Sequence, residues 1–151
     1  MIRCRPYVHD FAEKYALGES VEEQGDTDIH DVKALLDSMD GELRVEEDAY
    51  LPLCVAGEQV IIHGIIDLIH VTDTTVEIVD YKTDLGRHAQ AEYETQLSVY
   101  YHVLREAYPE RTITASLFLT ADGERVTIDP LSRQELEAVV RTELHGQEIR
   151  D

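Results

Sequence analysis

This 151-residue chain contains few cysteines and few lysines, and both shortages are informative. Cys4 and Cys54 lie far apart and no Cys-x-x-Cys pair occurs, so the sequence supports neither a zinc knuckle nor a disulfide framework. A GxxxxGK(S/T) loop is also missing, which excludes an ATP-driven motor within this chain. The apolar run at residues 60–71 is too short and too polar to span a membrane. The first twenty residues carry charges throughout and therefore do not indicate a signal peptide.

Lysine is scarce in a chain that is otherwise rich in charge. Three lysines and ten arginines accompany 32 acidic residues, and the formal net charge is −19. The hydrophobic fraction of 43% is still that of a globular protein, and we expect one domain over residues 1–151. An acidic, lysine-poor surface is typical of proteins that work in molar salt, where the Debye length falls to about 3 Å. We therefore expect a halophilic source and a cytoplasmic location.

A short buried strand is predicted at residues 76–82, which are rich in β-branched side chains and bounded by turn residues. Side chains alternate along a strand, so Asp80 and Lys82 share one face with two apolar residues. The strand therefore carries a carboxylate and an amine to the same side of the sheet.

A second carboxylate lies in the preceding strand, predicted at residues 60–71. Asp67 is surrounded there by isoleucine and leucine, and an isolated ion in such surroundings must neutralise or find a counter-charge. A divalent cation shared with Asp80 satisfies both carboxylates, since hard oxygen ligands suit Mg²⁺ or Mn²⁺. Such an ion acidifies a bound water, and Lys82 beside it could position that water and offset charge on a phosphate. The three residues predict phosphodiester hydrolysis.

Three motifs in this region resemble those of the PD-(D/E)XK nucleases. The similarity is to the RecB-like branch, which includes the nuclease domains of helicase-nucleases and the CRISPR-associated RecB-like exonucleases. In the family's order and with family-like gaps, the motifs are Gly64-Ile65-Ile66-Asp67, Asp80-Tyr81-Lys82-Thr83 and Gln96-Leu97-Ser98-Val99-Tyr100. The resemblance implies an α/β fold of the restriction-endonuclease type, with a mixed central sheet flanked by helices.

The resemblance also implies a role for each motif residue. Asp67 and Asp80 would be metal ligands, the main-chain carbonyl of Tyr81 would complete part of the metal shell, and Lys82 would be catalytic. His9, on a predicted early helix, matches the position of the family's metal-binding histidine. Plainer interpretations remain open. The Asp80 and Lys82 side chains could form a structural ion pair, Asp67 could be a turn or cap carboxylate, and His9 could be a packed or solvated ring.

Gln96 and Tyr100 are implied to lie against the DNA or the catalytic lysine, although they could equally be ordinary residues of an amphipathic helix. Glu46 or Glu47 could add an outer metal contact or form a solvated strand edge. Several relatives in the RecB-like branch carry an iron–sulfur cluster held by four cysteines. Two cysteines cannot supply that set, so we expect no iron–sulfur cluster here.

The sequence thus predicts a Mg²⁺- or Mn²⁺-dependent exonuclease that hydrolyses single-stranded or end-containing DNA in repair or recombination. Its partner could be a helicase domain or subunit, and the chain could be a stand-alone nuclease or a domain of a longer helicase-nuclease. A structure-selective endonuclease is one alternative, and a non-catalytic nuclease-like module that positions a helicase or another partner is a second. The charge of −19 leaves open an acidic protein that never touches nucleic acid, because phosphate affinity ordinarily comes from Lys and Arg.

Periodicity and turn signals give the expected order of elements. The expected ranges are a helix at 6–17, a loop at 19–28, a helix around 32–39, a meander of strands at 42–55, 60–71 and 76–82, a helix from 87 to about 108, strands at 111–120 and 126–128, and a helix opened by a capping box at Ser132 and Glu135. This order agrees with the αβββαβ core of the PD-(D/E)XK fold.

Overall fold

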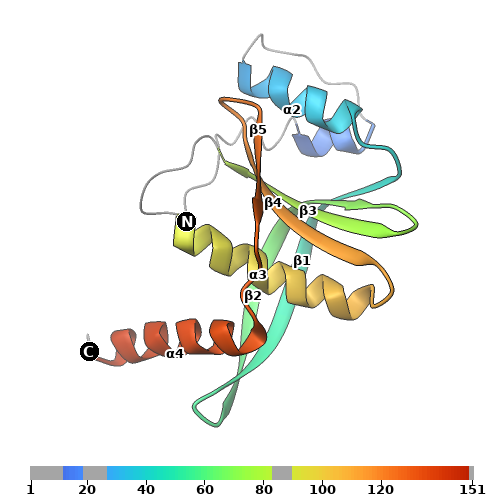
Figure 1. The fold of residues 1–151 in the computed structure, drawn as a ribbon. Coiled ribbons are helices and arrows are strands. Elements are labelled where there is room, and N and C mark those ends of the chain that lie inside the picture. Colours follow the sequence, from blue (N-terminus) through green and yellow to red (C-terminus); the bar gives the residue numbers. More distant parts are fainter. Residues whose placement is uncertain (1–11, 19–26, 83–89, 150–151) are drawn as a thin grey trace.

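The computed structural model describes residues 12–18, 27–82 and 90–149 (Figure 1). The elements are α2 (Thr27–Asp37), β1 (Glu42–Val55), β2 (Glu58–Val71), β3 (Thr75–Lys82), α3 (Gln90–Ala107), β4 (Thr112–Leu119), β5 (Glu124–Ile128) and α4 (Arg133–Ile149). Residues 12–16 are also helical, in agreement with part of the predicted first helix. No helix in these described ranges is long and apolar enough to cross a membrane.

The five strands form one mixed sheet in the order β1-β2-β3-β4-β5. The first three strands are an antiparallel meander, as predicted. β4 lies parallel to β3, and α3 makes the crossover between them. β5 pairs antiparallel with β4 through a turn that contains Gly123 at φ 67°. The α/β fold with a mixed sheet is therefore confirmed.

The boundary of α2 corrects the sequence prediction. The helix begins at Thr27, inside the stretch that we expected to be a loop. Ile29 is 2% exposed and joins Val32, Leu35 and Leu36 in the same buried cluster, so the apolar stripe starts one turn earlier than expected. The predicted capping box of α4 is present, because Ser132 and Glu135 each accept the other's backbone N–H at 3.1 Å.

Two apolar layers enclose the sheet. On one face, α3 and α4 pack against a cluster that includes Val76 and Ile78 of β3. On the other face, α2 and residues 12–16 pack against Val79 and Tyr81 of the same strand. Figure 1 shows α2 near the short helix of residues 12–16, away from α3 and α4. The alternation of β3 therefore places Asp80 and Lys82 on the α3 side of the sheet.

The hairpin of β1 and β2 extends beyond the rest of the sheet (Figure 1). β2 pairs with β1 along its whole length, but its ladder with β3 runs only from Leu68 to Val71. Residues 58–67 of β2 and their partners in β1 therefore form a two-stranded arm. α4 lies against this arm, and the Arg133 guanidinium donates to the Pro52 carbonyl at 2.6 Å.

β1 changes the face that it buries near Glu46, which has a positive φ of 49°. Leu43 and Val45 pack on the α2 side of the sheet, whereas Ala49 and Leu51, also at odd positions, pack on the α3 side. A left-handed residue interrupts the pleat and allows this reversal. Glu46 stands between the Val45–Leu68 and Glu47–Ile66 pairs, so the distortion lies opposite Asp67.

Candidate active site

Asp67 marks the point at which β2 and β3 separate. The last paired residues of the two strands are Leu68 and Val79, and one step beyond them the backbones no longer form a ladder. The Tyr81 N–H instead donates to Asp67 Oδ2 at 3.0 Å, so the carboxylate replaces a ladder acceptor. Asp67 is 4% exposed. The strand separation therefore opens a space beside β3 and fixes a buried carboxylate at its apex.

Asp80 and Lys82 project into the same space from the end of β3. Their side chains are 3% and 1% exposed, and Nζ lies 3.0 Å from Asp80 Oδ2. This contact is an ion pair by distance but lacks hydrogen-bond alignment, because Oδ2 has no hydrogen-bond partner. The ammonium group also lies over the Tyr93 ring of α3, 4.7 Å from its centroid. An ion pair between Asp80 and Lys82 is thus present, and the Tyr93 ring packs against its ammonium group.

The surroundings of Asp80 disfavour its ionised form. Burial raises the pKa of the Asp80 carboxyl well above 3.8, and repulsion from Asp67 and a hydrogen bond to that carboxyl raise it further, while Lys82 opposes the shift. Among the described residues that line the pocket, two buried carboxylates accompany one buried ammonium, so like charges lie close together in a place that water barely reaches. A bound cation would remove this penalty, because it favours the ionised form of both carboxyls.

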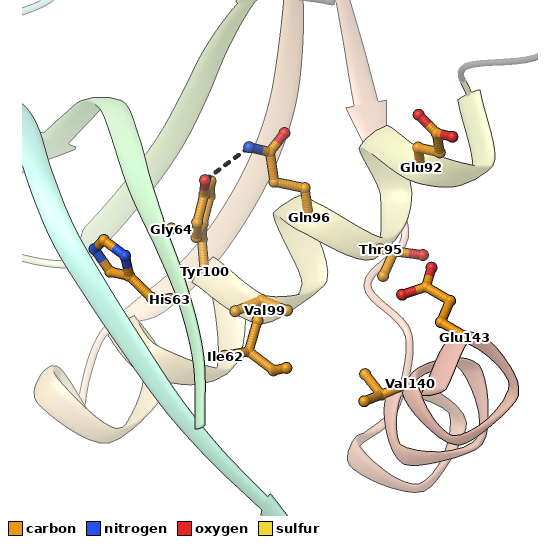
Figure 2. Close-up of a pocket in the computed structure, with 10 residues that line it drawn as sticks. All are labelled: Ile62, His63, Gly64, Glu92, Thr95, Gln96, Val99, Tyr100, Val140 and Glu143. Carbon is orange, nitrogen blue, oxygen red and sulfur yellow. Dashed lines mark hydrogen bonds between the residues drawn. The ribbon is translucent and has the colours of Figure 1, made fainter. Parts of the chain in front are cut away.

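Gln96 and Tyr100 attach α3 to β2 beside the carboxylates. The Gln96 amide donates to the Tyr100 hydroxyl at 2.8 Å (Figure 2). That hydroxyl donates to the Ile65 carbonyl at 2.9 Å. A Cβ on Gly64 would lie only 2.6–2.7 Å from the Tyr100 ring and hydroxyl, so the phenol can approach the strand only because residue 64 is glycine. The first and third motifs therefore meet in a direct contact.

The Tyr100 hydroxyl is a hydrogen-bond donor at neutral pH. Burial and repulsion from Asp80 raise its pKa to about 12, and its hydrogen bond with Gln96 offsets part of that rise. The phenol therefore remains protonated and cannot act as the base that accepts a proton from water. The Gln96 Oε1 atom is buried and has no hydrogen-bond partner among the residues that the structure describes, which leaves an acceptor at the wall of the site.

A pocket of about 290 Å³ unites these groups. It is lined by His63, Gly64, Ile65, Asp67, Asp80, Lys82, Gln96 and Tyr100. A second hollow of about 410 Å³ continues between α3, α4 and the arm and shares four of these residues (Figure 2). Glu92 and Glu143 stand at its far end, so its charge is unsuited to phosphate. The smaller pocket also contains two carboxylates, but it alone of the two is lined by Lys82, so it is the better place for a phosphodiester.

The structure brings together most of the site residues predicted from the sequence. Tyr81 contributes its backbone, since its ring lies on the opposite face, T-shaped against Phe118 with the ring centroids 6.5 Å apart. His9 falls outside the described residues. Within the described part of the chain, no three His, Cys, Asp or Glu residues form a metal-binding group, so neither Glu46 nor Glu47 completes one with Asp67 and Asp80.

Tyr93 and the arm residues were not predicted to belong to the site. Tyr93 precedes Gln96 by three residues and Tyr100 by seven, so helical spacing alone puts all three on one face of α3. That signal was therefore available in the sequence. His63 and Ile65 line the pocket because β2 continues past β3, which no local pattern indicates.

Comparison with known proteins places this fold and site in a nuclease superfamily. The sequence profile of the PD-(D/E)XK nuclease superfamily matches residues 6–150. Among solved structures, the crystal structure of SSO0001 is similar with a TM-score of 0.52 at 13% identity, over 93% of this chain and 85% of that one, a likeness of fold alone. No curated protein matches. With the profile match spanning almost the whole sequence, this chain belongs to the PD-(D/E)XK nuclease superfamily.

Proposed function

We propose that the protein is a Mg²⁺- or Mn²⁺-dependent deoxyribonuclease of the RecB-like type. In this proposal it acts as an exonuclease on DNA ends or single strands in repair or recombination, alone or beside a helicase domain or subunit. One observation carries it. Asp67, Asp80 and Lys82 converge, almost fully buried, on a pocket at the point where two strands separate.

The donor atoms present fit a hard divalent cation. The two buried carboxylates of Asp67 and Asp80 are oxygen ligands of the kind that Mg²⁺ and Mn²⁺ prefer. In the proposal, the Tyr81 carbonyl and His9 add further ligands to Asp67 and Asp80. When bound, the ion supplies positive charge to the phosphoryl oxygens and acidifies a water molecule.

Lys82 is placed to act on the phosphate. An ammonium group has three donors, and the Lys82 ammonium lies 3.0 Å from Asp80 Oδ2 in an ion pair without hydrogen-bond alignment. Its donors can orient the attacking water and a phosphoryl oxygen. As the water oxygen bonds to phosphorus, the bond to the leaving oxygen breaks, and charge that accumulates on the phosphoryl oxygens lies beside the ammonium.

Gln96 and Tyr100 serve as positioning residues in this scheme. Their hydrogen bonds hold α3 against β2 and keep Tyr93 over the ammonium group. The free Gln96 Oε1 can accept a hydrogen bond from a nucleotide or from water in the pocket. Correct placement matters because misalignment by about 1 Å can cost a hundredfold in rate.

A cleavage assay with matched lysine variants tests the proposal. End-labelled single-stranded DNA is incubated with Mn²⁺ in molar KCl and the wild-type protein, Lys82→Ala or Lys14→Ala, where Lys14 is an exposed lysine outside the pocket. We expect metal-dependent cleavage that Lys82→Ala abolishes and Lys14→Ala leaves unchanged. Release of nucleotides from one end supports an exonuclease, whereas cutting of circular single strands would favour the endonuclease. Absence of cleavage by the wild type would contradict the proposal.

A further inference from the structure

The outer face of the β1–β2 arm is an uncovered surface. On the inner face, Ala49, Leu51, Leu53 and Val55 are buried under the helices. The alternate positions face outward, and they are Asp48, Tyr50, Pro52 and Cys54 of β1 with Gln59, Ile61, His63 and Ile65 of β2. Tyr50 is 59% exposed, Ile61 63% and Ile65 41%. Large apolar groups on an open sheet face suggest a surface that receives a ligand.

Two rings on this face are already stacked on one another. Tyr50 and His63 are direct partners in the register of the hairpin. Their ring centroids are 4.6 Å apart and their planes differ by 16°, so they lie nearly parallel. His63 Nε2 is 2.9 Å from Asp48 Oδ1, which fixes the imidazole in this orientation. The pair presents a preformed flat aromatic surface.

The stacked pair borders the candidate active site. His63 and Ile65 line the pocket that contains Asp67 and Asp80. Residues 58–67 of β2 have no β3 partner, so only the width of one strand separates the outer face from the pocket. His63 precedes Asp67 by four residues, a distance of about 13 Å at the usual rise of about 3.3 Å per residue. Figure 2 shows His63 projecting away from Gln96.

The chemistry of this face favours nucleic-acid bases over phosphates. The eight outward positions include no lysine or arginine, so the face offers no fixed cation for a DNA backbone. Aromatic rings bind any unpaired base through its π-face, without sequence preference. Base pairs in a duplex hide these faces in their own stack. The occupant that fits is therefore a single strand, and the absence of surface cations matters less in high salt, where phosphate contacts are weak.

We propose that the Tyr50–His63 pair is a stacking platform for the bases of a single-stranded substrate as the strand enters the pocket. This inference rests on the proposed nuclease function and names its substrate class. The distance of about 13 Å from His63 to Asp67 corresponds to roughly four stacked nucleotides at about 3.4 Å each. A dinucleotide held at the carboxylates cannot reach the platform, whereas a longer strand can.

Substrate length provides the test. Cleavage of a DNA strand of about twenty nucleotides and of a dinucleotide is measured for the wild type, Tyr50→Ala, Tyr50→Phe and Leu17→Ala. Leu17 is 57% exposed and lies outside the arm, so its replacement is the matched control. On the long strand, we expect Tyr50→Ala to raise KM about 5- to 150-fold with little change in kcat, as loss of base stacking does. On the dinucleotide it has no effect, and Tyr50→Phe restores the wild-type KM.

The outcomes separate this inference from the nuclease proposal. A wild type that cleaves neither substrate contradicts the proposed function. A wild type that cleaves both, with Tyr50→Ala unchanged on the long strand, overturns the platform alone and leaves the face to a protein partner. Equal KM increases on the long strand and the dinucleotide also overturn it, because they indicate a structural effect on the pocket. Unfolding temperatures of the variants, measured in parallel, establish that all are folded.

Discussion

Replacement of Asp80 by asparagine should stabilise the metal-free protein. Asp80→Asn keeps the shape of the side chain and removes one of two adjacent buried carboxylates. The lost attraction to Lys82, at 3.0 Å, is about 5 kcal/mol at an effective dielectric of about 20. The substitution also removes two unfavourable contributions, the burial of a charged group and the repulsion from Asp67. Both affect the Asp80 pKa more strongly than Lys82 does.

The net change in the free energy of unfolding is the small difference between the lost attraction to Lys82 and the relief of burial and repulsion. Replacing poorly compensated buried charge is typically worth ~1–3 kcal/mol, which corresponds to an increase in Tm of roughly 2–12 °C for a domain of this size. The pH dependence has a definite sign. Because the folded pKa of Asp80 lies above the unfolded value of 3.8, the wild type loses stability as the pH rises through the folded pKa. The advantage of Asp80→Asn is therefore small near pH 4 and largest in alkaline solution.

Thermal unfolding of both proteins in molar KCl with EDTA, from about pH 4.5 to 9, measures this difference. The matched control is Asp48→Asn, which neutralises an exposed carboxylate of the arm. Added Mn²⁺ should raise the Tm of the wild type and leave that of Asp80→Asn unchanged. A Tm of Asp80→Asn equal to or below that of the metal-free wild type at pH 8 would refute the reasoning, as would a difference that does not vary with pH.

Three further substitutions follow from the site. Lys82→Ala should lower kcat by at least a hundredfold while Mn²⁺ affinity, followed by calorimetry, changes little; cleavage near the wild-type rate would remove the lysine from the mechanism. Gly64→Ala should destabilise the protein by ~1–3 kcal/mol and reduce kcat, because the new Cβ would lie 2.6 Å from the Tyr100 ring. Chemical denaturation measures the stability. An unchanged denaturation midpoint would show that α3 can shift away from β2 without loss of stability. His9→Ala should weaken Mn²⁺ binding by about tenfold or more, with exposed His30→Ala as the control, and an identical titration would demote His9 to a structural role.

The chemistry of β3 was predictable because it depends on alternation alone. A strand at residues 76–82 must place Asp80 and Lys82 on one face, and Gln96 and Tyr100 share a helix face by the same kind of periodicity. The structure adds the contacts among these groups. The hydrogen bond from Tyr100 to the Ile65 carbonyl joins residues far apart in the chain. It can form only because Gly64 has no side chain that would collide with the Tyr100 ring. Such a contact depends on how α3 packs against β2.

The separation of β2 from β3 was not predictable in the same way. It depends on where the hydrogen-bond ladder between β2 and β3 stops. At that point β1 is distorted at Glu46, and the Asp67 carboxylate accepts the hydrogen bond of the Tyr81 N–H. The stacked pair on the arm depends on register. Ala56 and Gly57 both have positive φ and Val55 pairs with Glu58, so the hairpin has a two-residue turn, whereas the predicted strands at 42–55 and 60–71 leave residues 56–59 between them. Only the shorter turn pairs Tyr50 with His63.

Calorimetric titration of Mn²⁺ into the metal-free protein, in molar KCl near pH 8, tests the central claim most directly. We propose Asp67 and Asp80 as a metal site because their two buried carboxylates converge on one pocket beside Lys82. Saturable binding by the wild type that disappears in Asp80→Ala is the predicted result. Absence of binding by the wild type, or equal binding by Asp80→Ala, would contradict the claim that these carboxylates hold the catalytic ion.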